Sequence, residues 1–196
     1  MTFYKKIIQE FRDWFELIFV RSLPNSFLGN RIRRLYWRWR VKSMGPNPII
    51  CRMAQIEVPS LVKIGMNFML GDNAIVNPGG SKGIYIGNDV SIASNSFLRA
   101  ANHSFDRIDI PISMQGHNYS TLEYNGSEYS IIIEDDVWLG YNVVLVSGAK
   151  IGEGSVVATG SVVSSIIPPY SIVVGNPGRV IGNRMKNLEK KNNEIQ

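Results

Sequence analysis

The chain has 196 residues, of which 44% are hydrophobic and 19% are charged, and it carries a net charge of +5. This length and composition exclude a globally disordered chain and favour one main folded domain with appendages. Its single cysteine, Cys51, excludes an internal disulfide framework and a cysteine-rich zinc site. No run approaches the roughly 20 apolar residues that span a bilayer, and the first residues do not follow the signal-peptide pattern, so we expect a cytoplasmic protein.

The basic charge is concentrated at the N-terminus. Residues 1–44 hold ten Lys or Arg and three Asp or Glu, a net charge of +7, whereas the rest of the chain holds eleven and thirteen, a net charge of −2. Residues 3–21 predict an amphipathic helix, because their apolar side chains recur at spacings of three and four. Residues 30–43 predict a second helix, basic and aromatic, which Gly45 ends. We therefore expect a helical arm over residues 1–45.

Three interpretations of this arm are open. It can cover an exposed end of the domain that follows, with its arginines in solvent. It can also contact an anionic membrane surface, at the inner face of the membrane, with Tyr36, Trp37 and Trp39 at the interface. Nucleic-acid binding is the least favoured interpretation, because the arm matches no nucleic-acid module and the remaining chain is slightly acidic. We therefore expect no nucleic-acid partner.

In the middle of the chain, aliphatic side chains recur every six residues. We call this six-residue repeat the beat. Helices repeat near 3.6 residues and strands near 2, so a period of six indicates short strands joined by turns in a coil with three flat faces. Small or polar residues follow most beat positions and let the backbone bend at the corners. The expected fold class is mainly β, a β-solenoid over residues 46–182. The beat falls on Ile64, Leu70, Val76, Ile86, Ile92 and Leu98, and then on Ile133, Leu139, Leu145, Ile151, Val157 and Val163.

Two excursions interrupt the beat. Residues 77–83, NPGGSKG, are interpreted as a turn, because their glycines lack the spacing of a phosphate-binding loop. A longer polar loop leaves the coil over about residues 102–130, and a loop of that length inside a compact domain is usually functional. The charged segment 183–196 is expected to form a short helical or disordered tail.

His103 lies at the root of the long loop. An imidazole there can act as a general base near neutral pH, although from spacing alone the commoner interpretation is an ordinary surface histidine. His117, inside the loop, is interpreted as a surface histidine. The sequence has no zinc-protease, P-loop or serine-hydrolase motif and no clustered His/Cys metal set. The carboxylates that could orient the His103 imidazole, without a basis for choosing among them, are Asp106, Asp109, Glu123 and Glu128.

Three stretches carry a family resemblance: residues 86–95 (IGNDVSIASN) followed by His103, residues 133–140 (IEDDVWLG), and residues 167–181 (IPPYSIVVGNPGRVI). Over about residues 60–182 the chain resembles the hexapeptide-repeat acyltransferases, which fold as a left-handed parallel β-helix. The matching branch contains the maltose and galactoside O-acetyltransferases and the O-acetyltransferases of bacterial surface polysaccharides. Repeats alone would indicate only the fold, whereas the three stretches together are specific.

The resemblance implies a homotrimer that binds acetyl-CoA in the groove between neighbouring subunits, without a metal. His103 would take the proton from an acceptor hydroxyl, and the hydroxyl oxygen would attack the thioester directly. The backbone N–H of Tyr141 would stabilise the oxyanion. The family usually has a smaller residue at this position, so a tyrosine there is expected to narrow the pocket.

Other roles are carried over by position. Asn73 and Asn95, together with Asp106 and Trp138, would contact the acceptor, although a turn-forming role for Asn73 is equally open. The pantetheine arm would run along Thr159 and Gly160. Ser164 and Ser165 stand where relatives often carry Thr-Lys near the CoA phosphates. The charge missing there would come from Arg179, Arg184 or Lys186, and Arg179 matches a basic residue at the nucleotide end of CoA.

The loop after His103 is longer than in the maltose and galactoside enzymes, which favours an acceptor bulkier than a free sugar. We therefore expect an acetyl-CoA-dependent O-acetyltransferase that acts on a sugar of a bacterial surface polysaccharide. Two alternatives stay open: N-acetylation of an amino sugar nucleotide, and a non-catalytic hexapeptide-repeat scaffold.

Overall fold

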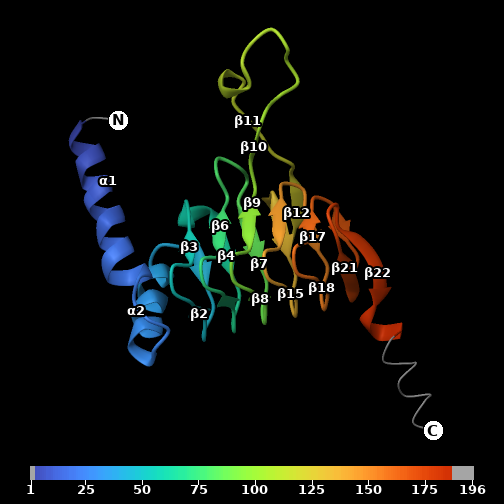
Figure 1. Ribbon diagram of the computed structural model, residues 1–196, viewed down its shortest axis with the longest axis horizontal. Coiled ribbons are helices and arrows are strands. Elements are labelled where there is room, and N and C mark those ends of the chain that lie inside the picture. Colours follow the sequence, from blue (N-terminus) through green and yellow to red (C-terminus); the bar gives the residue numbers. More distant parts are fainter. Residues whose placement is uncertain (1–2, 187–196) are drawn as a thin grey trace.

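The computed structural model describes residues 3–186 and shows a prism of stacked coils with a helical arm at one end (Figure 1). Three parallel sheets form the faces of the prism, and successive strands of the chain belong to the three faces in turn. This arrangement confirms the expected mainly β solenoid.

The strands are short, and each coil adds one strand to each face, except that the last coil adds none to face C. Face A contains β1 (Ser43–Met44), β4 (Val62–Ile64), β7 (Ile84–Ile86), β14 (Ile131–Ile133), β17 (Lys150–Ile151) and β20 (Ile166–Ile167). Face B contains β2 (Ile49–Ile50), β5 (Met69–Leu70), β8 (Ser91–Ile92), β15 (Trp138–Leu139), β18 (Val156–Val157) and β21 (Ser171–Val174), followed by the antiparallel β22 (Arg179–Asn183). Face C contains β3 (Gln55–Ile56), β6 (Ile75–Asn77), β9 (Phe97–Arg99), β16 (Val144–Val146) and β19 (Val162–Val163).

The core of the prism is built from one inward side chain per strand. Leu139 of β15 pairs in register with Ile92 of β8 and with Val157 of β18, and all three side chains are fully buried. Such stacked aliphatic rows remove a continuous strip of apolar surface from water, which is the main stabilising term of the fold. The six-residue beat is therefore confirmed as the core pattern. It also extends one coil further toward the N-terminus, through Met44, Ile50 and Ile56.

The corners require a backbone conformation that few residues adopt. Asn73, Asn95, Asn142 and Gly160 have φ values of 57°, 60°, 55° and 74°, in the left-handed region. Asparagine and glycine tolerate this region better than other residues do. This preference explains why asparagine or glycine stands three positions after the beat residues Leu70, Ile92, Leu139 and Val157.

The arm consists of α1 (Phe3–Glu16), a π-helical turn (Leu17–Arg21) and α2 (Phe27–Arg38). The first expected helix is therefore confirmed, and the second begins and ends earlier than the expected range of residues 30–43. Ser26 caps α2 by accepting a hydrogen bond from the Gly29 N–H at 3.2 Å. Figure 1 shows α2 against the first coils of the prism and α1 extending away from them. No helix in residues 3–186 has both the length and the apolar character needed to cross a bilayer.

α2 covers the open end of the core. Trp37 is fully buried in the core cluster, and Tyr36 packs against that cluster and donates a hydrogen bond from its hydroxyl to Glu16 at 2.7 Å. Expecting Tyr36 and Trp37 at a membrane interface was therefore wrong, because both side chains are used to attach the arm to the coils. Trp39, with 87% of its surface exposed, is the only one of the three that is free.

The long loop contains two antiparallel ribbons. The first, β10 (Asn102–His103) paired with β11 (His117–Asn118), projects from the prism and carries a 3₁₀ turn, Ile112–Met114, between its strands (Figure 1). The second pairs β12 (Leu122–Tyr124) with β13 (Ser127–Tyr129) and packs on face A, where the rings of Tyr85 and Tyr124 lie 4.9 Å apart.

Two short elements complete the described chain. Residues 77–83 form the expected turn, and Lys82 in this turn makes an ion pair with Glu128 of the second ribbon at 2.7 Å. A 3₁₀ turn, Pro59–Leu61, joins faces C and A in the first coil. Most of the predicted tail, from residue 187 onwards, lies outside the described residues.

Candidate active site

One edge of the prism, between faces B and C, carries five of the residues singled out by the resemblance; we call it the first edge. Backbone hydrogen bonds tie the corners of successive coils together: the Asn95 N–H donates to Asp72 O at 2.9 Å, and the Gly160 N–H donates to Tyr141 O at 2.8 Å. The corner residues of the first edge are Asp72, Asn73, Ser94, Asn95, Tyr141, Asn142, Thr159 and Gly160.

Tyr141 presents a free backbone N–H on this edge. The residues on either side donate along the column, since the Gly140 N–H bonds Val157 O at 2.8 Å and the Asn142 N–H bonds Ser94 O at 3.2 Å. Within residues 3–186 the Tyr141 N–H has no backbone acceptor. A free N–H at a corner can donate to a negatively charged oxygen, which is the chemistry of an oxyanion hole.

Asn73 and Asn95 also act as turn residues on the first edge. Both have positive φ, both are exposed, and the Asn73 side-chain amide donates to Asn95 Oδ1 at 3.3 Å. The turn-forming interpretation of Asn73 therefore describes its backbone. Its remaining hydrogen-bonding capacity faces solvent.

The other edge, between faces C and A, is where the long loop leaves the coil; we call it the second edge. His103 lies there on β10, directly opposite His117 on β11. Their rings stack with centroids 4.9 Å apart and an interplanar angle of 29°. His117, interpreted from sequence as an ordinary surface residue, is thus the immediate neighbour of His103. A hollow of about 100 Å³ beside the pair is lined by Asn102, His103, Phe105, Asn118, Tyr119, Ser120 and Ser147.

None of the four carboxylates considered for orienting His103 is hydrogen-bonded to it in the described part of the chain. Asp109 pairs with Arg107, whose hydrogen bonds hold the pKa of that carboxyl below its usual value. Glu128 pairs with Lys82, and Asp106 and Glu123 are exposed. The stacked His117 ring is therefore the side chain that packs against the imidazole.

His103 and the Tyr141 N–H lie on different edges of the same chain. Tyr141 is in the corner before β16 of face C, and His103 follows β9 of the same face, so the width of face C separates them. One chain alone does not bring the two groups together.

The other singled-out residues divide between the edges and the outer faces. Trp138 points outward from face B with 55% of its surface exposed, and it lines a hollow of about 440 Å³ that includes Asp136 and Arg184. Thr159 and Gly160 are exposed on the first edge, whereas the exposed Ser164 and Ser165 are on the second edge. Asp106, exposed in the first ribbon, lies three residues beyond His103.

Among the basic residues proposed near the CoA phosphates, Arg184 is already engaged. It bonds Asp136 at 3.1 Å and also contacts Gly154 O. Arg179, on β22, is exposed and has a single 3.3 Å contact to the neighbouring Gly178 O. Within residues 3–186, no three His, Cys, Asp or Glu side chains gather in a way that could hold a metal ion.

Comparison with known proteins agrees with this geometry. Residues 130–165 match the family model described as bacterial transferase hexapeptide (six repeats), and residues 61–100 match the hexapeptide repeat of succinyl-transferase. The chain is 36% identical over 131 residues to a putative acetyltransferase of Saccharomyces cerevisiae, covering 64% of this chain and 61% of that protein. It is 33% identical to the galactoside O-acetyltransferase of Escherichia coli, covering 65% of this chain and 60% of that enzyme. The chain thus spans about three-fifths of the length of these relatives.

Solved structures extend the match to nearly the whole chain. A hexapeptide-repeat acetyltransferase of Vibrio cholerae, complexed with acetyl coenzyme A, superposes with a TM-score of 0.68 at 27% identity, covering 90% of this chain and 85% of that one. A galactoside acetyltransferase in complex with coenzyme A gives a TM-score of 0.70 at 23% identity, covering 93% and 84%. AntD, an N-acyltransferase of Bacillus cereus solved with dTDP and 3-hydroxybutyryl-CoA, gives 0.59 at 21%, covering 83% and 94%. By its repeats and its fold, the chain resembles the hexapeptide-repeat acyltransferases, and it has the left-handed parallel β-helix expected from that resemblance.

Proposed function

We propose that this protein is an O-acetyltransferase that transfers an acetyl group from acetyl-CoA to a sugar hydroxyl. The observation that carries the proposal is the placement of His103 and the free Tyr141 N–H on the two edges that border face C. A second copy set beside the first would bring one copy's His103 edge toward the other copy's Tyr141 edge. The proposed assembly is a homotrimer, in which each of three grooves contains one complete site.

In the proposed reaction, the His103 imidazole takes the proton of the acceptor hydroxyl while the hydroxyl oxygen attacks the thioester carbonyl. The pKa of a sugar hydroxyl lies far above neutral pH, so proton removal has to accompany the attack. The Tyr141 N–H of the adjacent copy donates to the oxyanion of the tetrahedral intermediate. As that intermediate collapses, the C–S bond breaks and the imidazolium returns the proton to the departing thiolate, which leaves as free CoA.

Acetyl-CoA binding would use both edges. We assign the pantetheine arm to Thr159 and Gly160, and the phosphate end to Ser164, Ser165 and Arg179. Arg179 is favoured over Arg184 for the phosphates, because Arg184 is already paired with Asp136. A guanidinium matches phosphate geometry with two parallel hydrogen bonds.

The acceptor would lie between the first ribbon and the neighbouring first edge. Asn73, Asn95, Asp106 and Trp138 all present exposed polar or aromatic groups that suit a sugar. The ribbon projects well beyond the prism (Figure 1), which favours a large acceptor such as a unit of a bacterial surface polysaccharide. We propose that the reaction takes place in the cytoplasm.

N-acyl transfer to an amino sugar nucleotide is a second candidate. The N-acyltransferase AntD shares the fold and was solved with dTDP, a nucleotide. Its identity to this chain is 21%, so it supports the fold alone. An amine acceptor would need the same base and the same oxyanion donor, which is why the acceptor has to be tested directly.

Release of free CoA from acetyl-CoA tests the proposal, with sugars, amino sugar nucleotides and lipid-linked sugars offered as acceptors. We expect turnover with a hydroxyl acceptor, and a loss of about 10²- to 10⁴-fold in kcat for His103→Ala, the range for removing a general base. Size-exclusion chromatography with light scattering should show an unchanged trimer for this variant. Undiminished turnover in an intact His103→Ala trimer would contradict the enzyme proposal and favour a scaffold.

A further inference from the structure

α1 carries its apolar side chains outward. Large apolar residues recur along one side of the helix, and most of their surface is exposed: 77% for Phe3, 69% for Phe11 and 67% for Trp14. Helices of globular proteins normally turn such a side toward the core. We call this surface the apolar face of α1; it consists of Phe3, Tyr4, Ile8, Phe11, Trp14 and Phe15, continued by Ile18 and Phe19 of the π-helical turn.

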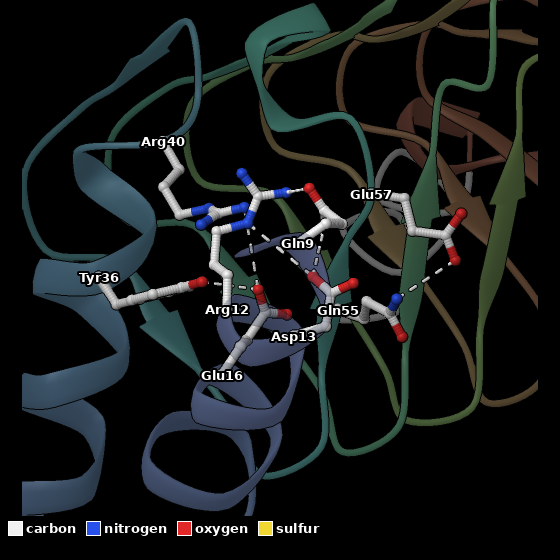
Figure 2. Close-up of polar contacts among 8 residues, drawn as sticks. All are labelled: Gln9, Arg12, Asp13, Glu16, Tyr36, Arg40, Gln55 and Glu57. Carbon is white, nitrogen blue, oxygen red and sulfur yellow. Dashed lines mark hydrogen bonds and ion pairs between the residues drawn. The ribbon is translucent and has the colours of Figure 1, made fainter. Parts of the chain in front are cut away.

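The opposite side of α1 explains this orientation, because it is polar and faces the rest of the protein. Figure 2 shows Gln9, Arg12, Asp13 and Glu16 turned toward side chains of α2 and of the first coil. Glu16 is buried and accepts the hydrogen bond of the Tyr36 hydroxyl at 2.7 Å. Burial, and then the bond to Glu16, raise the pKa of that hydroxyl, so the contact is a neutral donor on a carboxylate.

These polar groups surround a cavity of about 510 Å³, which lies between α1, the residues that follow α2 and the first coil. Arg40 approaches Glu16 at 4.0 Å across it, and Gln55 donates to Glu57 at 3.3 Å on the coil side. A cavity lined by these charged and amide groups does not suit the aromatic side of α1. The contacts of Glu16 with Tyr36 and Arg40 hold the polar side of α1 inward, and its apolar face is left outward.

Charge indicates what covers the apolar face. Residues 1–44, which contain α1 and α2, carry a net charge of +7, and Lys5 and Lys6 are the basic residues of the first turns of α1. A second copy docked arm against arm would bring two arms of like net charge together across a symmetric contact. An anionic lipid surface attracts them and accepts aromatic side chains at headgroup level.

We propose that the apolar face of α1 binds the surface of an anionic lipid bilayer, with the helix lying in the interface. This inference is independent of the acyl-transfer proposal, because the face lies on the arm and contains none of the residues assigned to that reaction. It also replaces the membrane interface expected from Tyr36 and Trp37, because these side chains attach α2 to the coils.

Vesicle co-sedimentation of the full chain tests the proposal, with vesicles of phosphatidylcholine alone and with vesicles that also contain phosphatidylglycerol. We expect binding to the anionic vesicles and its loss on raising NaCl to about 0.5 M, where charge attraction is screened. Phe11→Ser/Trp14→Ser should weaken the vesicle partition coefficient by about tenfold or more, since two aromatic side chains lose their burial. Lys5→Glu/Lys6→Glu should weaken anionic binding while leaving the apolar face intact.

Ile112→Ser/Met114→Ser is the matched control, because it removes two apolar side chains of comparable exposure, 55% and 73%, from the first ribbon. Circular dichroism should show equal helix content in all variants. Equal binding to both kinds of vesicle would overturn the proposal, as would equal weakening in the control.

If Phe11→Ser/Trp14→Ser changes the sedimentation coefficient without lipid and leaves vesicle binding unchanged, the face binds a second copy and the proposal is wrong. CoA release with a soluble acceptor is followed in parallel, so that failure of the enzyme proposal is seen separately.

Discussion

The pair of stacked histidines determines how His103 is held. Histidines that act as general bases are commonly fixed by a carboxylate, but none is bonded to His103 within residues 3–186. Ring packing at 4.9 Å against His117 restrains the imidazole instead. Packing sets the plane of the ring, and a proton transfer that depends on a short, aligned contact is sensitive to that plane.

His117→Ala should therefore lower kcat by about ten- to a hundredfold, because the unrestrained imidazole samples unproductive orientations. KM for acetyl-CoA should change little, since His117 is not among the residues assigned to acetyl-CoA binding. His117→Phe keeps a flat ring and should restore most of the activity. Steady-state kinetics at saturating acceptor measure the effect. An unchanged kcat in His117→Ala, or a loss in His117→Phe equal to that of Ala, would show that stacking has no part in catalysis.

At the level of elements, the repeat could be predicted from the sequence, because each coil has the same local requirement. One inward aliphatic residue and one small corner residue are needed every six positions, so Leu139 and Gly140 could be assigned without knowledge of the rest of the fold. The first ribbon follows no such rule. Its register depends on Gln115, whose side chain bonds the backbone of Arg107 at 2.7 Å and of Ile110 at 3.1 Å. No periodic pattern encodes those contacts, so the pairing of His117 with His103 could not be predicted.

The arm was predicted as helical for the same local reason, but the burial of its aromatic residues was not. Trp37 and Trp39 are two positions apart on or beside one helix, so they point to different sides. Composition alone could not say which of them is buried. The sequence therefore predicted the body of the fold and the locations of candidate residues, while long-range contacts decided which residues meet.

Arg33 is the residue on which attachment of α2 depends. It is fully buried, and its guanidinium donates to Ile50 O and Leu23 O at 2.5 Å, and to Asn30 Oδ1 at 2.6 Å. These bonds connect the helix, the turn before it and the first coil. Lysine could not replace the planar fork that reaches all of them.

Arg33→Met should lower the free energy of unfolding by about 3 kcal/mol, because several buried acceptors lose their donor. Urea unfolding measures this change. Quenching of tryptophan fluorescence by acrylamide should also rise, because loosening of α2 makes Trp37 accessible. Arg31→Met is the control, since Arg31 is exposed on the same helix and should shift stability by less than about 0.5 kcal/mol. Equal effects of the two substitutions would show that the cap does not depend on Arg33.

For the whole molecule, the separation of the two edges would make the proposed catalysis a property of the assembly. Under the proposed mechanism, a chain that carries His103 on one edge and the Tyr141 N–H on the other would have two half-sites and no complete one. In a closed ring of three copies, each interface would pair unlike edges, which is a heterologous contact. The proposed activity then requires the trimer and cannot be recovered in a monomer.

Tyr141→Pro removes the oxyanion donor without touching His103, and should reduce kcat by about 10²- to 10³-fold. When His103→Ala and Tyr141→Pro chains are co-expressed with different tags, an interface is active if the Tyr141→Pro chain supplies the histidine and the His103→Ala chain supplies the amide. Random mixing in equal amounts makes three of every four trimers mixed, and each mixed trimer has one active interface in three. CoA release should therefore return to about one quarter of the wild-type rate.

Co-expression of His103→Ala with the double variant His103→Ala/Tyr141→Pro is the matched control, because no chain in that mixture supplies a histidine. It should stay inactive while forming trimers of the same size. Tyr141→Ala keeps the N–H and should lose far less activity than Tyr141→Pro, which separates the amide from the side chain. If each chain carried its own complete site, mixing the two defective chains would recover nothing, because every chain would still lack one of its two groups. Recovery near one quarter therefore requires that the base and the oxyanion donor of each site come from different copies.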